Sequence, residues 1–311
     1  MQCILDTTKL VEIFIECDDF IKGIEEFLDA HSLPDVENSK RKRERQMSKS
    51  EMMAIIIYYH YSGFKCFKWY YNHVIKKAFS TYFPTAFSYS RFIQLMWEVN
   101  IYLAFFMNAC RLSIPTNGNY IDSKKLVVSH NRRINNHKVH QGLAQRGKSS
   151  TGWFFGFKLH LIINHLGEIV LFKLTPGNVA DNNHKLLESI AEKLECFLFG
   201  DKGYISKIAA SLKMKGLNLI TKLRKNMKPK GELSPEQKYY MKHRGLIETA
   251  FDILKHIFDI EHSRNRSTKN YFANVLGAII AYTFLDKTPA IPTYQQKMTA
   301  HDFENAQIIL K

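Results

Sequence analysis

The stretch Phe197-Leu198-Phe199-Gly200-Asp201 predicts a buried strand that ends at an acidic residue. A second short apolar stretch, Tyr120-Ile121-Asp122, follows the turn signal Asn117-Gly118 and ends in the same way. Ligand sites in α/β sheets lie at the carboxyl ends of strands, so two carboxylates placed there could converge on one site. A single aspartate after a strand is more often a turn or helix-capping residue. The sequence therefore favours a shared site only if a further acidic residue joins these two.

The segments around these two strands give the order of the elements. Hydrophobic patterning predicts strands at 119–122, 155–164, 168–174, 196–200 and 218–223, and helices at 185–194, 205–215, 239–258 and 271–284. Hairpin-linked strands followed by alternating helices and strands (βββαβαβα) indicate an α/β fold. We expect a mixed five-stranded sheet with helices on both faces.

The first 115 residues predict helices only. Apolar residues recur at helical spacing from Leu10 to Phe27, and Ser48-Lys-Ser-Glu51 is a capping-box pattern that opens an apolar helix. Short helices flanked by Lys and Arg could form a helix-turn-helix-like DNA reader, although a helical cap with an aromatic core fits equally well. The expected organisation is a helical region over 1–115, an α/β domain over 116–290 and a C-terminal tail over 291–311.

Composition and charge narrow the classes of function. With 45% hydrophobic residues in 311, the chain can bury a sizeable core, which excludes a disordered tail or a collagen-like protein. The formal net charge is +15. That excess indicates a polyanionic partner, most simply nucleic acid, with an anionic membrane surface as the weaker alternative. A basic run at 40–45 reads as an exposed linker that could also touch DNA.

Cysteine usage and the length of the apolar runs predict the cellular location of the protein. The five cysteines form no C-x-x-C pair, so neither a disulfide framework nor a zinc ribbon is indicated. The longest apolar stretches fall short of the roughly 20 residues that a membrane-spanning helix needs. We therefore expect a cytoplasmic protein with no membrane partner.

A third carboxylate, Glu248, is predicted on the helix over 239–258. One helix face carries four charged residues at i, i+4, i+8 and i+11, namely Arg244, Glu248, Asp252 and Lys255. This face could be an ordinary ion-paired surface, and Asp252 is the main rival of Glu248. Three carboxylates brought together would raise one another's pKa values, and Mg²⁺, which prefers oxygen ligands, would remove that repulsion. Such a cluster suits phosphodiester chemistry, because two metal ions can serve the attacking and the leaving oxygen.

Positive charge is concentrated in two segments of the α/β part. Residues 122–160 hold eight Lys or Arg and a single acid, and residues 202–230 hold nine and no acid. These segments predict phosphate-holding surfaces. Within them we expect DNA contacts from Arg146, Lys148, Lys202, Lys222, Arg224 and Lys225.

Other motifs carry weaker predictions. Residues 142–149 fit G-x-x-x-x-G-K-S, but a buried strand before and a helix after are missing, so a flexible basic loop is predicted instead of a nucleotide site. The spacing of His130, His137, His140 and His160 fits no zinc template well, so phosphate contacts or core packing are favoured. Asp181 is predicted to be a turn residue, or one that contacts metal ligands rather than the metal.

Five blocks of the sequence taken together resemble bacterial insertion-sequence transposases of the DDE class. They are Tyr120-Ile-Asp122-Ser, Arg146 to His160, Leu174-Thr-Pro-Gly-Asn178, Phe199-Gly-Asp201-Lys-Gly-Tyr204 and Ile247-Glu248-Thr. The resemblance spans about Leu10 to Pro289. It implies an RNase H-like catalytic core over 116–290, similar to that of retroviral integrases. It also implies that the triad Asp122, Asp201 and Glu248 binds two Mg²⁺ ions, with Mn²⁺ as a substitute.

The resemblance also implies roles for two basic residues. Related transposases carry the signature Y-x2-R-x3-E-x6-K, in which the Arg and Lys contact DNA near the cut end. Arg244, Glu248 and Lys255 match it, whereas Met241 stands at the tyrosine position. This departure puts a tyrosine role in doubt and leaves the triad untouched.

The sequence therefore predicts a DNA transposase that hydrolyses a phosphodiester at the element end and joins the resulting 3′-OH to target DNA. Its partner would be double-stranded DNA in the bacterial nucleoid. Because two ends must be held together, a homodimer or larger synaptic complex is expected. The alternatives are a domesticated or decayed DNA-binding protein without catalysis, and a metal-dependent nuclease of the same fold.

Overall fold

The computed structural model describes residues 5–31, 46–149, 151–223, 226–227, 232–261, 265–295 and 297. The basic run at 40–45, Arg224, Lys225 and most of the C-terminal tail lie outside these residues. The chain forms two compact units, one from Met1–Arg111 with Ile253–Leu285 and the other from Leu112–Asp252 with Asp286–Lys311. Among the described residues, none of the helices combines the length and apolarity needed to cross a bilayer.

The first unit is helical, as its sequence predicts. Its α-helices are α1 (Thr7–His31), α2 (Lys49–Tyr61), α3 (Phe67–Tyr70), α4 (Tyr89–Leu95), α5 (Asn100–Phe106) and α10 (Thr268–Thr283). Shorter 3-10 or π segments are η1 (Tyr71–Ala78), η2 (Met96–Val99), η3 (Met107–Arg111) and η6 (Ile253–Ile257). Ser48 caps α2 with the predicted capping box: its hydroxyl accepts from the amide of Glu51, whose carboxylate accepts from the amide of Ser48.

The last helix, α10, belongs to this unit by its contacts and packs against α2. Gly277 makes the close approach possible, because a Cβ there would lie 2.7 Å from Cγ2 of Ile56. This division differs from the expected ranges, which assign 253–285 to the α/β domain. The difference arises because α10 is apolar nearly all round and finds its core among the N-terminal helices.

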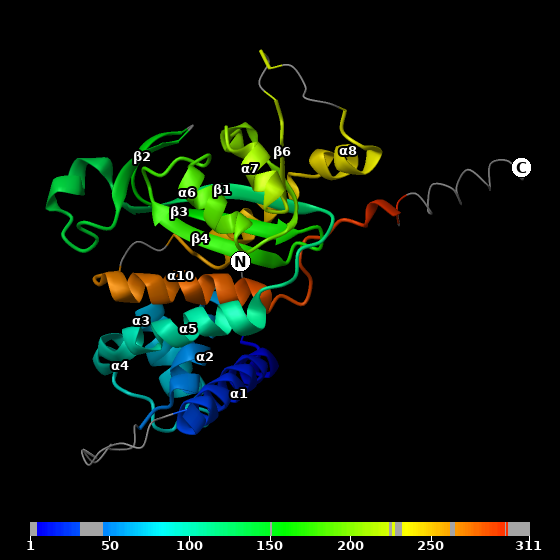
Figure 1. Ribbon diagram of the computed structural model, residues 1–311. Coiled ribbons are helices and arrows are strands. Elements are labelled where there is room, and N and C mark those ends of the chain that lie inside the picture. Colours follow the sequence, from blue (N-terminus) through cyan, green and yellow to red (C-terminus); the bar gives the residue numbers. More distant parts are fainter. Residues whose placement is uncertain are drawn as a thin grey trace, which may run out of the picture. The chain divides into compact units, whose positions relative to one another are not determined.

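The second unit is built on a mixed six-stranded sheet (Figure 1). Its strands are β1 (Asn119–Ser129), β2 (Gln145–Ser149), β3 (Gly152–Asn164), β4 (Ile169–Pro176), β5 (Cys196–Gly200) and β6 (Leu217–Thr221). Its helices are α6 (His184–Ala191), α7 (Ala209–Met214), α8 (Pro235–Lys242) and α9 (Leu246–Asp252), with 3-10 turns η4 (Asn131–Asn136) and η5 (Lys202–Tyr204). The five predicted strands are all present, and the mixed α/β architecture agrees with an RNase H-like core.

The strand order is β2-β3-β1-β5-β6, with β4 paired to β3. The pairs β1–β3, β2–β3 and β3–β4 are antiparallel, whereas β5 runs parallel to β1 and to β6. An apolar core of β1, β3, β4, α6 and α7 residues, including Ile121, Ile162 and Leu187, covers one face of the sheet. The parallel register of β1 and β5 places the carboxyl end of β5, at Gly200, beside Ile121 near the start of β1.

Two sequence predictions in this unit are corrected. Residues 145–149 form the edge strand β2 and not a flexible loop, because Arg146↔Phe155 and Lys148↔Trp153 pair in register with β3. The single helix predicted over 239–258 is interrupted at His243–Gly245, between α8 and α9, and then passes into the π-helical segment η6. Glycine is a poor helix former, which accounts for a break at this position.

Candidate active site

Two neighbouring strands position the first two predicted carboxylates. Tyr120 pairs with Phe199 in the parallel register of β1 and β5, and Asp122 and Asp201 each follow two residues later. Side chains two residues apart on a strand point to the same face, so Asp122 lies on the same face of β1 as Tyr120, while Asp201 comes directly after Gly200, the last residue of β5. The structure thus places Asp122 and Asp201 on neighbouring strands. Asp201 follows the end of β5 as predicted, but Asp122 lies within β1, which continues to Ser129 and does not end at residue 122.

Asp122 is partly buried, and a backbone amide fixes its orientation. Its Oδ1 accepts from the amide of Ser123 at 2.8 Å. The pKa of Asp122 is raised from 3.8 to about 6, chiefly by burial and also by the charges of Asp201 and Asp181, against the lowering effects of the Ser123 amide and Arg244. The site therefore places a carboxylate where its negative charge is poorly compensated.

Asp201 begins the short 3-10 turn η5 as its N-cap. Its Oδ1 accepts from the amide of Gly203 at 2.6 Å. This contact is the turn role considered from the sequence, and it occurs together with the position beside Asp122. Gly203 lies close to this carboxylate, since a Cβ there would be 2.8 Å from Asp201 Oδ1.

Glu248 comes from α9, which packs against β1. Lys124, on the same face of β1 as Asp122, lies over the ring of Phe251 of this helix with its Nζ 6.0 Å from the ring centroid. Arg244 Nη2 lies 2.8 Å from Glu248 Oε1, and the charge of Arg244 also lowers the pKa of Asp122. Arg244 therefore neighbours both acidic residues, while the Glu248 side chain is 56% exposed.

The donor set of the site suits a hard divalent cation, because it consists of carboxylate oxygens. In the described parts of the chain, no group of three Asp, Glu, His or Cys side chains is gathered for one metal ion. Glu248 Oε1 is held by Arg244 in this conformation. The poorly compensated charge of Asp122 beside Asp201 is nevertheless the electrostatic situation that a cation relieves.

Residues 113–268, half of the chain, match a family described as transposase DDE domain. The chain belongs to this family. A comparison with curated proteins gives no match. DDE transposases generally use divalent metal ions. The family match covers β1, β5 and α9, the three elements that carry the predicted triad.

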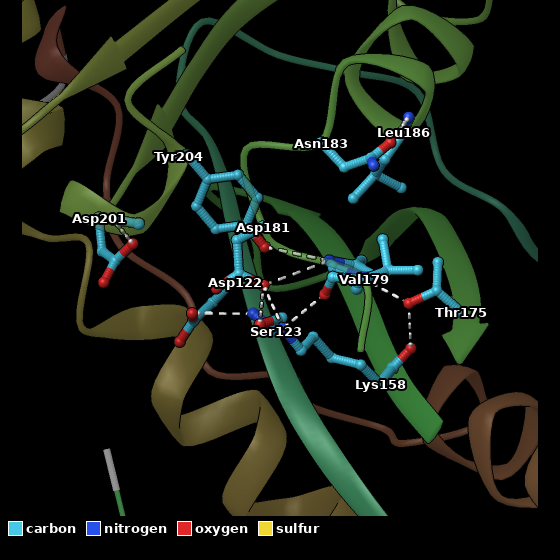
Figure 2. A network of polar contacts seen from close by, with 12 residues as sticks. Asp122, Ser123, Lys158, Thr175, Val179, Asp181, Asn183, Leu186, Asp201 and Tyr204 are labelled. Atoms are coloured by element: carbon cyan, nitrogen blue, oxygen red, sulfur yellow. Dashed lines mark hydrogen bonds and ion pairs between the residues drawn. The ribbon is translucent and has the colours of Figure 1, made fainter. Parts of the chain in front are cut away.

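Sequence reasoning missed the lysine behind the site of this DDE domain. Asp181 Oδ1 accepts from Ser123 Oγ at 2.7 Å and from Lys158 Nζ at 3.1 Å (Figure 2). Lys158 lies in the mostly apolar strand β3, and a lysine there needs a carboxylate partner. That signal was available in the sequence, but the partner on a later loop was not.

The four histidines singled out in the sequence pack against neighbouring side chains or cap turns of the DDE domain. His160 is buried, with Nδ1 3.3 Å from the Tyr204 hydroxyl and Nε2 3.1 Å from Thr175 Oγ1. Burial lowers its pKa to about 4. The rings of His137 and His140 stack with centroids 5.3 Å apart, and His130 Nδ1 accepts from the amide of Arg132.

The predicted DNA-contacting residues lie on several elements of the transposase. Arg146 and Lys148 of β2 lie over the half-exposed ring of Trp153, at 4.7 and 5.8 Å from its centroid. Lys202 is exposed in η5 beside Asp201, and Lys222 is exposed after β6. Lys255 lies in η6, where its Nζ is 3.2 Å from Glu261 Oε2.

Proposed function

We propose that this chain is an active DNA transposase that cuts DNA at the ends of its mobile element and joins those ends to a target. The observation that carries the proposal is the parallel register of β1 and β5, which supports Asp122 and Asp201 as a pair of metal ligands beside α9. Glu248 is the third ligand. A double-stranded DNA substrate fits the net charge of +15.

The carboxylates of Asp122, Asp201 and Glu248 would hold Mg²⁺, for which Mn²⁺ can substitute. Two such ions, when bound, promote attack on a phosphodiester and stabilise the oxygen that leaves. The chain's own contribution is orientation. The amide of Ser123 fixes Asp122, and the amide of Gly203 fixes Asp201.

Arg244 has two roles in this proposal. It compensates negative charge beside Glu248 and Asp122. Its Nε is buried and has no hydrogen-bond partner among the described residues, so a phosphate oxygen of the DNA can take that place. Lys202, Arg146, Lys148 and Lys222 supply further positive charge in the same unit, and Lys255, Arg224 and Lys225 remain proposed contacts.

The reaction proceeds in two displacements. Water attacks the phosphorus at the element end, the bond from phosphorus to O3′ breaks, and O3′ leaves as a hydroxyl. That hydroxyl then attacks a phosphodiester of target DNA, forms a new bond to phosphorus and releases a 3′-OH of the target. Neither step needs a covalent bond between protein and DNA.

The test uses a supercoiled plasmid that carries both DNA ends flanking the gene, incubated with the protein and Mg²⁺. Wild type should nick at the element ends and join them to target DNA, and Asp122→Asn should bind the same DNA without nicking it. Sequence-specific binding without metal-dependent nicking by wild type would establish the alternative of a catalytically inactive DNA-binding protein. Nicking without joining of a 3′-OH end would establish a nuclease instead.

A further inference from the structure

We infer that Asp181, which Lys158 holds in place, is a positioning residue. It fixes the orientation of both proposed metal-binding aspartates through the residues whose amides donate to them. This inference rests on the proposed function and deepens it. It concerns the supports of Asp122 and Asp201, and it assigns no additional metal ligand.

The strand geometry shows which residues lie behind Asp122, on the opposite face of the sheet. Ser123 and Lys158 lie on one face of the sheet, because Ser123 pairs with His160 and Lys125 pairs with Lys158 in the β1–β3 register. Asp122 precedes Ser123 and therefore points to the opposite face. The network of Ser123, Lys158 and Asp181 thus lies behind the strand that presents Asp122.

Ser123 joins this network to Asp122. Its amide donates to Asp122 Oδ1 at 2.8 Å, and its hydroxyl donates to Asp181 Oδ1 at 2.7 Å. Both the backbone and the side chain of one residue are therefore engaged. A shift of Asp181 would move Ser123 and, with it, the amide that orients the Asp122 carboxylate.

The second oxygen of Asp181 reaches the support of Asp201. A Cβ on Gly203 would lie 2.8 Å from Asp201 Oδ1 and 3.3 Å from Asp181 Oδ2, so both carboxylates approach this glycine closely. Gly203 donates the amide hydrogen bond that orients Asp201. Asp181 therefore binds Ser123 through Oδ1 and lies close to Gly203 with Oδ2, and these two residues donate the amides that orient Asp122 and Asp201.

Lys158 holds Asp181 in this place. Its Nζ lies 3.1 Å from Asp181 Oδ1 and donates to the carbonyl of Val179 at 2.8 Å. The Lys158 side chain is only 12% exposed, so the ion pair is shielded from water. His160 is buried on the same face, where its ring nitrogens contact the hydroxyls of Tyr204 and Thr175.

Residues that orient metal ligands typically change metal affinity by 10- to 100-fold when they are replaced. We therefore expect Asp181→Asn and Ser123→Ala each to weaken Mn²⁺ binding about tenfold. Ser123→Thr keeps the hydroxyl and should bind Mn²⁺ like wild type. Because the hydrogen bond that Ser123→Ala removes is one that Asp181→Asn also disturbs, the double variant should bind Mn²⁺ no more weakly than Asp181→Asn alone.

The experiment measures Mn²⁺ binding to the full chain by calorimetry, together with circular dichroism to check folding. Matched controls remove the same groups elsewhere in the unit: Ser189→Ala, whose hydroxyl donates to the carbonyl of Leu186, and the exposed Glu192→Gln. Both should bind Mn²⁺ like wild type. If Asp181→Asn does not fold, the Ser123→Ala and Ser123→Thr pair decides the question.

The outcomes separate this inference from the proposed function. If Asp122→Asn loses Mn²⁺ binding while folded Asp181→Asn and Ser123→Ala keep it, the positioning role is wrong and the metal assignment stands. Equal loss in Ser123→Thr and Ser123→Ala would also overturn it. If wild type binds no Mn²⁺, or Asp122→Asn binds as wild type does, the proposed metal site itself fails.

Discussion

The folded protein disfavours the ionised form of the Asp122 carboxyl. Burial raises its pKa from 3.8 to about 6, and the neighbouring Asp201 and Asp181 act in the same direction. A carboxyl whose pKa is higher in the folded than in the unfolded state binds its proton more tightly when folded. Without a cation, the ionised site therefore lowers the stability of the fold at neutral pH.

We expect Asp122→Asn to be more stable than wild type at neutral pH without divalent cations, by on the order of 2 kcal/mol. Wild type should lose stability as the pH rises from about 4 to about 6, where Asp122 ionises, and should change little from this source above that range. Asn cannot titrate, so the difference should vanish at the acidic end. Urea unfolding across this pH range measures it, and a difference that does not vary with pH would contradict the assignment.

The third carboxylate can be tested against its rival. Glu248 contacts Arg244, which neighbours Asp122, whereas Asp252 lies exposed at the end of α9. We expect Glu248→Gln to reduce Mg²⁺-dependent cleavage at least about 100-fold and Asp252→Asn to reduce it less than about threefold, since only the former removes a metal ligand. Cleavage of end-bearing plasmid is the readout, and the reverse order would assign the third position to Asp252.

The sequence locates Asp122 and Asp201 because each follows an apolar run, but it places only one strand end correctly. Asp201 follows the end of β5, whereas Asp122 lies within β1, whose continuation begins with the polar and basic residues 123–125 and is not predicted as strand. The link from Lys158 to Asp181 could not be found, because the two residues are brought together by the hairpin register and by the course of the loop after β4. Pairing in a sheet is decided by the whole fold, and no local pattern encodes it.

The edge strand β2 is an element that local sequence patterns do not predict. Its residues are polar and basic, so no alternation of apolar side chains marks them as a strand. Pairing with β3 makes the strand, and Gly147 allows it, because a Cβ there would lie 2.0 Å from the carbonyl oxygen of Gly177. Lysine and arginine on an exposed edge also discourage pairing with another chain.

Basic residues on β2 should contribute to DNA affinity without contributing to sequence preference. We expect Arg146→Ala with Lys148→Ala to weaken binding similarly for all duplexes and to reduce the slope of log K against log salt by about two, one for each phosphate that is no longer neutralised. The control pair is Lys185→Ala with Lys193→Ala. These exposed lysines belong to the α6 segment, which covers the sheet face opposite Asp122.

Filter binding at several salt concentrations measures both slopes. The β2 pair should lower the slope and the α6 pair should leave it unchanged. An unchanged slope for the β2 pair would mean that Arg146 and Lys148 serve only to cover the edge strand and Trp153.

The two compact units of the chain do not follow one another along the sequence in the way that the sequence predicts. The helical unit contains residues from both sides of the α/β unit, because α10 packs against α2. Ten of the thirteen residues of α2 are buried. A fragment ending at Arg111 would leave much of that surface in water, at roughly 25 cal/mol per Å² of apolar area.

We therefore expect the fragment 1–111 to lack a cooperative thermal transition, and a single chain joining 1–111 to 253–285 through a flexible linker to recover one. Circular dichroism on heating measures both. Cooperative unfolding of the shorter fragment would show that the N-terminal helices form a core without α10.

The late position of α10 also governs events on the ribosome. Helices made first must wait until residues 253–285 have emerged, whereas the strands from 119 to 221 can pair meanwhile. An mRNA truncated within the α/β part would thus yield a polypeptide whose N-terminal helices expose apolar surface. Such a polypeptide is prone to binding by chaperones and to degradation.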